Sequence, residues 1–180
     1  MTIREAVAAD IPQMALMHVR SWQAAYRGMI PQDYLDSLDP ADRADRWTRI
    51  MRDLDPARGG VLVAEGNGGL CGLACFGPTG DEDAESDQVG EVKAIYLAPA
   101  VWGQGYGRAL MATCLGRLAG AGFSQATLWV LDANTRARRF YDAAGFRTDG
   151  AVKIDDRGTF QLRELRYRRR LANYPKNLRH

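Results

Sequence analysis

The chain has 180 residues, of which 46% are hydrophobic and 26% are charged, with 24 Lys or Arg against 22 Asp or Glu. This composition is typical of one globular domain, which we expect to span residues 1–180. A chain of this length buries roughly 70% of the surface that its unfolded form exposes. Its stability therefore does not require a metal ion or a disulfide framework.

The three cysteines do not form a metal-binding or disulfide pattern. Cys71, Cys75 and Cys114 lie in apolar stretches, without C-x-x-C spacing and without histidines nearby. We expect reduced, buried thiols in a cytoplasmic protein, and no zinc or iron–sulfur centre. No stretch reaches the ~18 apolar residues of a membrane span, and residues 1–10 carry charge where a signal peptide is apolar. We therefore expect no metal and no membrane partner.

Basic residues are concentrated at the end of the chain. Residues 163–180 hold seven Lys or Arg and one Glu, a net charge of +6, so residues 1–162 carry −4. A solvated final strand followed by a frayed tail explains this pattern. An RNA-binding surface is the alternative interpretation.

The first third of the chain is expected to be mostly helical. After a short strand at residues 2–7, apolar residues recur at helical spacing over residues 10–26. Pro31 favours the start of another helical turn, and residues 41–51 follow Pro40 with helical periodicity. The pattern thus predicts three helical segments before the first long strand.

Strands dominate the middle of the chain. The apolar residues 59–65 and 70–76 are separated by Gly-Asn-Gly-Gly, which predicts an antiparallel hairpin. Residues 79–87 contain no apolar residue larger than alanine and predict an exposed loop. A β-rich strand at residues 89–97 follows and ends before Pro99.

The rest of the chain alternates helices and strands. The apolar alternation slips between Leu162 and Leu165, which predicts a bulge in the last strand. The order of strand, glycine turn, helix, strand and helix indicates an α/β (α+β) fold, with a parallel pair in the middle of the sheet and antiparallel strands outside it. These later elements are expected as a helix at 109–120, a strand at 126–131, a helix at 135–144 and a strand at 159–168.

A glycine-rich turn lies directly between a predicted strand and a predicted helix. Residues 102–108 read Trp-Gly-Gln-Gly-Tyr-Gly-Arg, and such glycines let main-chain N–H groups approach an anion at a helix start. The dinucleotide pattern G-x-G-x-x-G fails because Arg108 stands at its third glycine, and no Gly-Lys-Ser/Thr of a P-loop follows. The turn predicts a diphosphate cradle with Arg108 beside it, and a packing device is the alternative.

These residues resemble two motifs of the GNAT N-acetyltransferase superfamily. The first, Gln/Arg-x-x-Gly-x-Gly/Ala after a strand ending in hydrophobic-x-Pro, resembles Leu97-Ala98-Pro99 followed by residues 102–107. The second resembles Asn134-x-x-Ala137-x-x-Phe140-Tyr141-x-x-x-Gly145-Phe146. The match covers roughly residues 59–147, and the order of elements extends it over the chain. Trp102 departs from the pattern, and we expect Arg108 or Gln104 to replace the usual Gln or Arg contact to phosphate.

The resemblance implies a mixed, mostly antiparallel sheet with a central parallel strand pair, flanked by helices. It implies acetyl-CoA as co-substrate, lying between the strand that ends at Leu97 and the strand at 126–131, with no metal. Backbone N–H groups there would stabilise the oxyanion that forms during attack, although Ile95 and Leu97 also suit plain core positions. The cofactor-binding residues that it implies are Ile95, Tyr96, Leu97, Gly103, Gln104, Gly105, Tyr106, Gly107, Arg108, Asn134, Ala137 and Tyr141.

Acetyl transfer by direct attack requires an uncharged amine. A lysine-like amine with a pKa of about 10.4 needs about 4.6 kcal/mol to be neutral at pH 7, so its proton must be taken up. Glu91, 14 residues before Gly105, aligns with the general-base glutamate of the histone-acetylating branch of the superfamily, and burial would raise its pKa to a useful value. A solvated Glu91 with water as the base is the alternative. His18 is expected to pack on a helix face.

Two residues of the second motif have implied roles at the cofactor. Tyr141 matches the family tyrosine that protonates the leaving thiolate, and its phenol carries the donor which that step requires. Packing beside Phe140 is the alternative role of Tyr141. Asn134 is expected to cap the following helix while it contacts the cofactor, and capping alone is the alternative.

The acceptor pocket is expected to form from the first helices and the loop before the strand at 89–97. In this chain the corresponding segment contains Trp22, Tyr26 and Tyr34, whose aromatic faces suit a cationic amine. Carboxylates of the loop would add to that attraction, and a mobile loop over buried aromatics is the alternative. The loop carboxylates are Asp81, Glu82, Asp83, Glu85 and Asp87.

The sequence therefore predicts an N-acetyltransferase that moves an acetyl group from acetyl-CoA to a primary amine of a small molecule, a peptide or a protein in a ternary complex. Cys114 lies mid-helix among apolar residues and is not expected to act as a nucleophile. One alternative acetylates aminoacyl-tRNA through the basic C-terminus, and another is a CoA-binding sensor without turnover. The resemblance also implies a homodimer.

Overall fold

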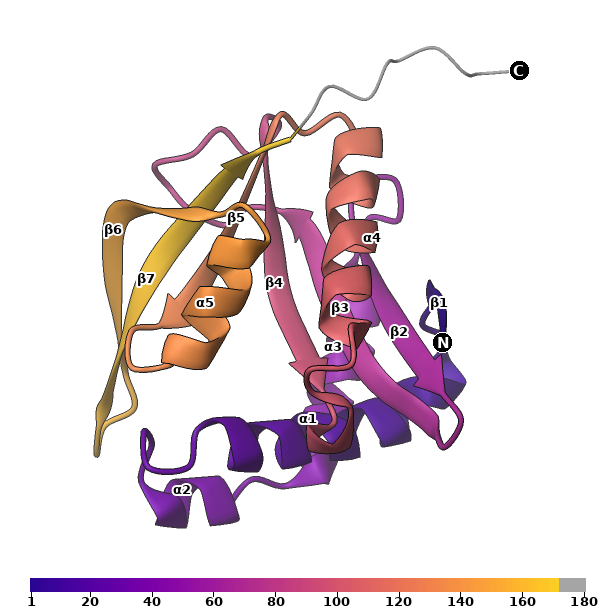
Figure 1. Ribbon diagram of the computed structural model, residues 1–180, viewed down its shortest axis with the longest axis vertical. Coiled ribbons are helices and arrows are strands. Elements are labelled where there is room, and N and C mark those ends of the chain that lie inside the picture. Colours follow the sequence, from indigo (N-terminus) through magenta and orange to yellow (C-terminus); the bar gives the residue numbers. More distant parts are fainter. Residues whose placement is uncertain (172–180) are drawn as a thin grey trace.

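The computed structural model describes residues 1–171, which form one seven-stranded sheet with helices on both faces (Figure 1). The strand order is β1-β2-β3-β4-β5-β7-β6. The strands are β1 (Thr2–Glu5), β2 (Gly60–Gly66), β3 (Gly69–Pro78), β4 (Val89–Leu97), β5 (Gln125–Leu131), β6 (Arg147–Asp156) and β7 (Gln161–Arg170). The α-helices are α1 (Ile11–Ala25), α2 (Gln32–Asp36), α3 (Pro40–Asp53), α4 (Tyr106–Gly120) and α5 (Thr135–Ala143).

Each face of the sheet has its own apolar core. Side chains alternate between the two faces along a strand. On one face, Leu110 and Leu118 of α4 pack with Val92 of β4 and with α5. On the other face, Met14 of α1 and Trp47 of α3 pack on β2 and β3. We call these the α4 face and the α1 face.

The sheet opens between β4 and β5. These strands are parallel neighbours, but they pair only from Val89–Glu91 to Gln125–Thr127. Beyond Glu91, β4 continues for six residues with no hydrogen-bonded neighbour on its β5 side, and Figure 1 shows the two strands separating. The backbone edge of residues 92–97 is therefore available to a ligand. All other neighbouring strands of the described sheet are antiparallel.

The predicted fold class, with a central parallel pair among antiparallel strands and flanking helices, is confirmed. The hairpin, the helical first third and the strand–turn–helix order are confirmed as well. One strand was missed, because β6 is exposed for most of its length and its only large apolar residues are Val152 and Ile154. The bulge expected in the last strand was wrong: the irregular pairing lies between Thr148 and Val152 of β6.

The loop at residues 79–87 is only partly the exposed segment that its composition predicted. Thr79 is buried, and the carboxylates of Asp81 and Asp83 bind the guanidinium of Arg166 on β7. The prediction failed because a loop without apolar residues was still anchored by ion pairs. The loop thereby lies across β5 and β7 rather than standing free in solvent.

Other predictions concern the cysteines, membrane spans and the C-terminus. Cys71, Cys75 and Cys114 are buried and free, as expected. Within residues 1–171, no helix is both long and apolar enough to cross a membrane. The frayed tail predicted after the last strand lies outside the described residues.

Candidate functional site

The glycine turn leads from β4 into α4 with the backbone conformation that its sequence requires. Gly103 and Gly105 have φ values of 76° and 90°, in the region that side chains with a Cβ rarely adopt, and both are open to solvent. Gly107 is needed for a different reason. A Cβ there would lie 2.9 Å from Leu97 and 3.4 Å from Phe140, so this glycine lets α4 pack closely on β4 and α5.

The start of α4 presents free backbone donors. The N–H groups of Tyr106, Gly107 and Arg108 are in the first turn of the helix, and no described residue accepts a hydrogen bond from them. The Arg108 side chain beside them is exposed. Gln104 is turned away, because its amide donates to the carbonyl of Ala100 at 2.8 Å. Helix-start donors beside an exposed guanidinium are a combination that is able to hold an anion.

Trp102 connects the turn to both sides of the strand opening. Its indole N–H donates to the carbonyl of Leu97 at 3.1 Å, which fixes the turn against the end of β4. The guanidinium of Arg136, in the first turn of α5, lies 3.5 Å from the centre of the indole ring. This stacking brings a second cation to the glycine turn from the β5 side of the opening.

Asn134 shapes the other side of the opening. It is 4% exposed, and its side-chain oxygen accepts the N–H of Ala137 at 3.0 Å. Asn134 therefore caps α5 as predicted, and this cap fixes where the helix starts beside the end of β5. Its expected contact with the cofactor stays a prediction, as does that of Ala137.

Three tyrosines converge at the opening from different elements: Tyr26 at the end of α1, Tyr96 on β4 and Tyr141 on α5. Burial raises the pKa of all three phenols, and the nearby Tyr96 phenol further raises the pKa of Tyr26 and of Tyr141. The Glu164 carboxylate also raises the pKa of Tyr26, so β7 contributes to the same space. These phenols are therefore proton donors at neutral pH.

Glu91 lies on β4 where the pairing with β5 ends. Its neighbours Gly90 and Val92 face α4, so Glu91 points to the α1 face. Burial raises the pKa of its carboxyl, against the opposing effects of Lys93 and of the Gly80 N–H, which donates to Oε2 at 3.3 Å. Glu91 is thus a carboxylate of raised basicity at the closed end of the opening.

The loop at 79–87 is held over the same face by a buried arginine. Arg166 is 5% exposed and forms ion pairs with Asp81, Asp83 and Asp149 at 3.1, 2.5 and 2.8 Å. Asp81 also accepts the indole N–H of Trp129 at 3.0 Å. Arg166 therefore pairs with two of the five loop carboxylates, whereas Glu82, Glu85 and Asp87 form no ion pair within the described residues.

The aromatic residues predicted for the acceptor pocket lie in one group. Trp22 and Tyr26 meet edge to face with ring centres 4.9 Å apart, and Tyr34 meets Phe160 at the same distance. All four pack against one apolar cluster, which is formed by Ile30, Leu35, Leu131 and Leu162.

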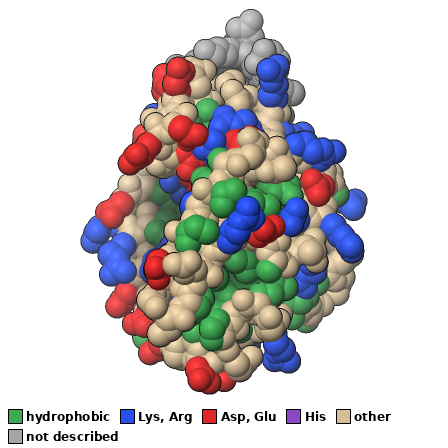
Figure 2. All heavy atoms as spheres, turned by 90° about the vertical axis from the view of Figure 1, so that its left-hand side faces the viewer, with side chains coloured by type: hydrophobic (Ala, Val, Ile, Leu, Met, Phe, Trp, Pro, Cys, Tyr) green, Lys and Arg blue, Asp and Glu red, His purple; other side chains and the backbone are tan. Residues whose placement is uncertain are grey.

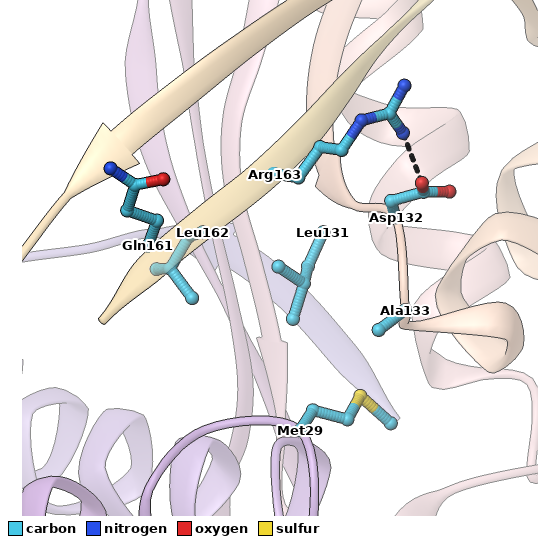
Figure 3. Close-up of a pocket in the computed structure, with 7 residues that line it drawn as sticks. All are labelled: Met29, Leu131, Asp132, Ala133, Gln161, Leu162 and Arg163. Carbon is cyan, nitrogen blue, oxygen red and sulfur yellow. Dashed lines mark hydrogen bonds and ion pairs between the residues drawn. The ribbon is translucent and has the colours of Figure 1, made fainter.

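A cavity of about 410 Å³ adjoins this group (Figure 3). In the figure, Met29 lies below Leu131, and the ion pair of Asp132 with Arg163 lies on the opposite side of the pocket. The cavity is open to solvent beside the predicted acceptor aromatics. Its lining residues are Met29, Leu131, Asp132, Ala133, Gln161, Leu162 and Arg163.

Comparison with known proteins gives one consistent result. Residues 19–146 match the Acetyltransferase (GNAT) family. The chain is 41% identical over 135 residues to the uncharacterized N-acetyltransferase YuaI of Bacillus subtilis, covering 74% of this chain and 73% of that protein. The chain belongs to the GNAT acetyltransferase family.

Solved structures show the same GNAT fold. A ribosomal-protein-alanine N-acetyltransferase from Brucella melitensis superposes with a TM-score of 0.73 at 22% identity, over 95% of this chain and 100% of that chain. The PaiA N-acetyltransferase from Thermoplasma acidophilum, in complex with coenzyme A, has a TM-score of 0.71 at 18% identity, over 94% and 98%. At these identities the likeness establishes the architecture.

The structure brings most of the predicted residues of this GNAT chain to the strand opening. The glycine turn, residues 95–97, Tyr141 and Asn134 surround it, and Glu91 lies at its closed end. Tyr34 is farther out, against Phe160. Sequence reasoning missed Arg136 and Glu164, because neither belongs to a fixed position of the quoted motifs. In the described residues, no group of three His, Cys, Asp or Glu side chains is placed to hold a metal ion.

Three of the five arginines of β7 in this GNAT chain are held in ion pairs. Arg163 pairs with Asp132, Arg166 with three aspartates, and Arg168 with Asp149. Figure 2, which looks onto the left-hand side of Figure 1, shows acidic and basic side chains interleaved over the upper half and hydrophobic ones gathered lower down. Within residues 1–171, this interleaving lends no support to RNA binding.

Proposed function

We propose that the chain is an acetyl-CoA-dependent N-acetyltransferase that moves the acetyl group to a primary amine by direct attack. The observation that carries this proposal is the opening between β4 and β5, flanked by free N–H donors of α4 and by the partly buried Tyr141 of α5. Membership of the GNAT family and the coenzyme A complex of PaiA support it.

The residues at the opening fit coenzyme A. The N–H groups at residues 106–108 and the exposed Arg108 suit the diphosphate, and no atom lies within 4 Å of a Cβ position at Gly103 or Gly105. The unpaired edge of residues 92–97 suits the amides of the pantetheine arm. When bound, the thioester would supply the activated acetyl group. Backbone N–H groups of this edge would stabilise the negative charge on its oxygen.

Glu91 is the base in this proposal. An amine with a pKa of about 10.4 must lose a proton at a cost of about 4.6 kcal/mol at pH 7, which a nearby carboxylate offsets by accepting that proton. The raised pKa of Glu91 improves it as an acceptor. Its position on the α1 face allows the amine to approach from the side opposite α4. A water molecule would relay the proton where the amine does not reach Glu91 directly.

Tyr141 is the acid. Burial keeps its phenol protonated at neutral pH, so its O–H can donate a proton to the thiolate of coenzyme A as the thiolate leaves. A cysteine nucleophile is disfavoured, because burial raises the pKa of Cys75 to about 11 and that of Cys114 to about 12. Little thiolate is then present at pH 7, which favours direct attack over an acetyl-enzyme.

A thiol-release assay tests the proposal. The protein is incubated with acetyl-CoA and a panel of primary amines, and free coenzyme A is measured with a thiol reagent. We expect release above the hydrolysis background with at least one amine, and an acetylated product by mass spectrometry. If the protein binds acetyl-CoA but releases no coenzyme A with any of the amines, it is a CoA-binding sensor instead. A homodimer stays a prediction from the family resemblance, and a cytoplasmic location stays a prediction from the cysteine pattern and the charged residues 1–10.

A further inference from the structure

Five buried side-chain nitrogen atoms have no hydrogen-bond partner, and all of them lie in one place. They are Nδ1 and Nε2 of His18 and Nε1 of Trp22, on α1, and Nε of Arg43 and Nε1 of Trp47, on α3. No other buried side-chain nitrogen or oxygen in residues 1–171 lacks a partner. Buried polar groups are normally satisfied, so such a concentration requires an explanation. We call His18, Trp22, Arg43 and Trp47 the donor cluster.

The donor cluster is compact and lies against β4. The imidazole of His18 stacks on Tyr96 with ring centres 4.2 Å apart, and the rings of Trp22 and Trp47 lie 5.7 and 5.9 Å from it. The guanidinium carbon of Arg43 lies 5.8 Å from the centre of the Trp22 ring. His18 and Trp47 are only 3% and 2% exposed. The cluster therefore forms part of the interior beside the strand opening.

The cluster has many donors and few acceptors. Both indoles and the Arg43 guanidinium only donate hydrogen bonds. Burial and the charges of Arg43 and Arg46 lower the pKa of His18 to about 3, so its neutral ring offers one donor and one acceptor. The Trp22 N–H is near enough to the Tyr96 phenol to lower its pKa, against the larger effect of burial, but the pair does not meet hydrogen-bond geometry. Four donors thus face one acceptor, in a region of positive charge.

The donor cluster adjoins the amine site. Tyr96 belongs to the strand that borders the opening, and Trp22 contacts Tyr26, whose phenol shares its surroundings with Tyr141. Arg43 is only partly buried, so the donor cluster reaches the surface at this side chain. A group bound here would be part of a molecule whose amine reaches the opening from the α1 face.

We propose that the donor cluster binds the carboxylate of the acceptor, so that the acceptor is a primary amine that also carries a carboxylate, as amino acids and peptides do. A carboxylate offers several acceptor sites and a negative charge, which matches indole donors and an arginine. This inference rests on the proposed N-acetyltransferase function, because it names the substrate class of the same site.

Binding to matched pairs of compounds tests the inference. The protein, saturated with coenzyme A, is titrated with amino acids and dipeptides and with the amide of each, with calorimetry as the readout. We expect at least one acid to bind at least tenfold more tightly than its amide. Arg43→Gln should abolish that preference, whereas Arg49→Gln, an exposed arginine on the same helix, should retain it. Trp47→Phe, which removes one N–H from the cluster, should reduce the preference about threefold.

Thermal melts accompany each variant, so that loss of the fold is distinguished from loss of binding. The inference is overturned if no acid in the panel binds, if acids and amides bind equally, or if Arg43→Gln leaves the preference intact. It is also overturned if a crystal structure shows only water in the cluster while the acceptor lies elsewhere. If the protein transfers acetyl groups but binds acids and amides equally, the proposed function stands and the inference fails. If it prefers acids but transfers no acetyl group, the carboxylate site stands and the proposed function fails.

Discussion

The two faces of the sheet differ in how completely their polar groups are satisfied. On the α4 face, α4 and α5 cover a continuous apolar core, and none of its buried side chains holds an unpartnered nitrogen or oxygen. On the α1 face lie all five unpartnered nitrogens, together with Glu91, Trp129 and the ion pairs of Arg166. The free donors for an anion, in contrast, are main-chain groups at the start of α4.

This difference separates two kinds of recognition. Main-chain donors in a glycine turn depend little on side-chain identity, so they suit a co-substrate that is the same throughout a family. Side-chain donors, carboxylates and aromatics, which are the polar groups of the α1 face, depend on residue identity and suit a particular acceptor. The comparison predicts that variants on the α1 face alter acceptor chemistry, and that variants of the glycine turn alter coenzyme A binding.

The largest expected effect is that of Glu91→Gln. Removing the base should lower kcat about 10³-fold, within the range known for general bases, while the Kd of acetyl-CoA stays within twofold. Steady-state thiol release and calorimetry measure the two quantities. Glu82→Gln, an exposed glutamate of the loop at 79–87, is the control and should retain full activity.

The pH profile gives an independent test of the same residue. Because Glu91 must be ionised to accept a proton, kcat/KM should fall as pH decreases through its pKa, which burial raises above the usual glutamate value. This acid limb should disappear in Glu91→Gln. If the decrease of kcat/KM at low pH is unchanged in Glu91→Gln, another group causes it, and water rather than Glu91 is the base.

The next largest effect is on stability. Arg166→Met leaves Asp81 partly buried without a cation and leaves Asp149 paired with Arg168 alone, and should lower the free energy of unfolding by about 3 kcal/mol. Urea denaturation measures this loss. The exposed Arg170→Met on the same strand is the control and should change stability by less than about 0.5 kcal/mol.

The same ion pairs make a pH-dependent contribution. Arg166 lowers the pKa of Asp83, and hydrogen bonds from Ala151, Arg168 and Arg166 lower that of Asp149 despite burial. The folded-state values lie below the unfolded values, so this stability is present above the ordinary aspartate pKa and is lost as pH falls through the folded-state pKa. Arg166→Met should weaken that acid dependence, and an unchanged dependence would argue against these pairs.

Much of the fold was predictable because its elements carry local signals. The hairpin between β2 and β3, the helix stops and the turn into α4 follow from glycine and from apolar periodicity. β6 was not predictable from its pattern, because it is an edge strand with little buried surface. The anchoring of the loop at 79–87 depends on Arg166, 83 residues beyond Asp83, and such an ion pair has no local signal.

The candidate site also contains some residues that the sequence predicted and others that it did not. The glycine turn and Tyr141 were found through motifs with fixed spacing. The donor cluster was not found, because His18 lies on α1 whereas Arg43 and Trp47 lie on α3, and only packing brings the two helices together beside β4. Arg136 was missed for the same reason, because its stacking on Trp102 depends on how α5 packs beside the glycine turn.

A moderate effect is expected from the glycine turn itself. Gly105→Ala places a Cβ on a residue with φ of 90°, and this strain should distort the donors at the start of α4. The Kd of coenzyme A should rise about tenfold in calorimetry, which corresponds to about 1.4 kcal/mol. Gly116→Ala, in open space within the same helix, should leave the Kd unchanged. An equal response of both variants would mean that helix stability, not turn geometry, controls binding.

The smallest expected effect concerns the cation that α5 places beside Trp102. Arg136→Met should raise the Kd of coenzyme A about fivefold at low salt and less at 0.5 M NaCl, because salt screens the attraction between a guanidinium and phosphate. Arg139→Met, an exposed arginine of the same helix, should have no such effect. In the double variant Trp102→Arg/Arg136→Met, a guanidinium returns at the position where the family usually has Gln or Arg, and the Kd should return to within twofold of the wild type. Failure of this rescue, with each variant folded, would show that Arg136 acts by holding Trp102 in place and not by supplying charge.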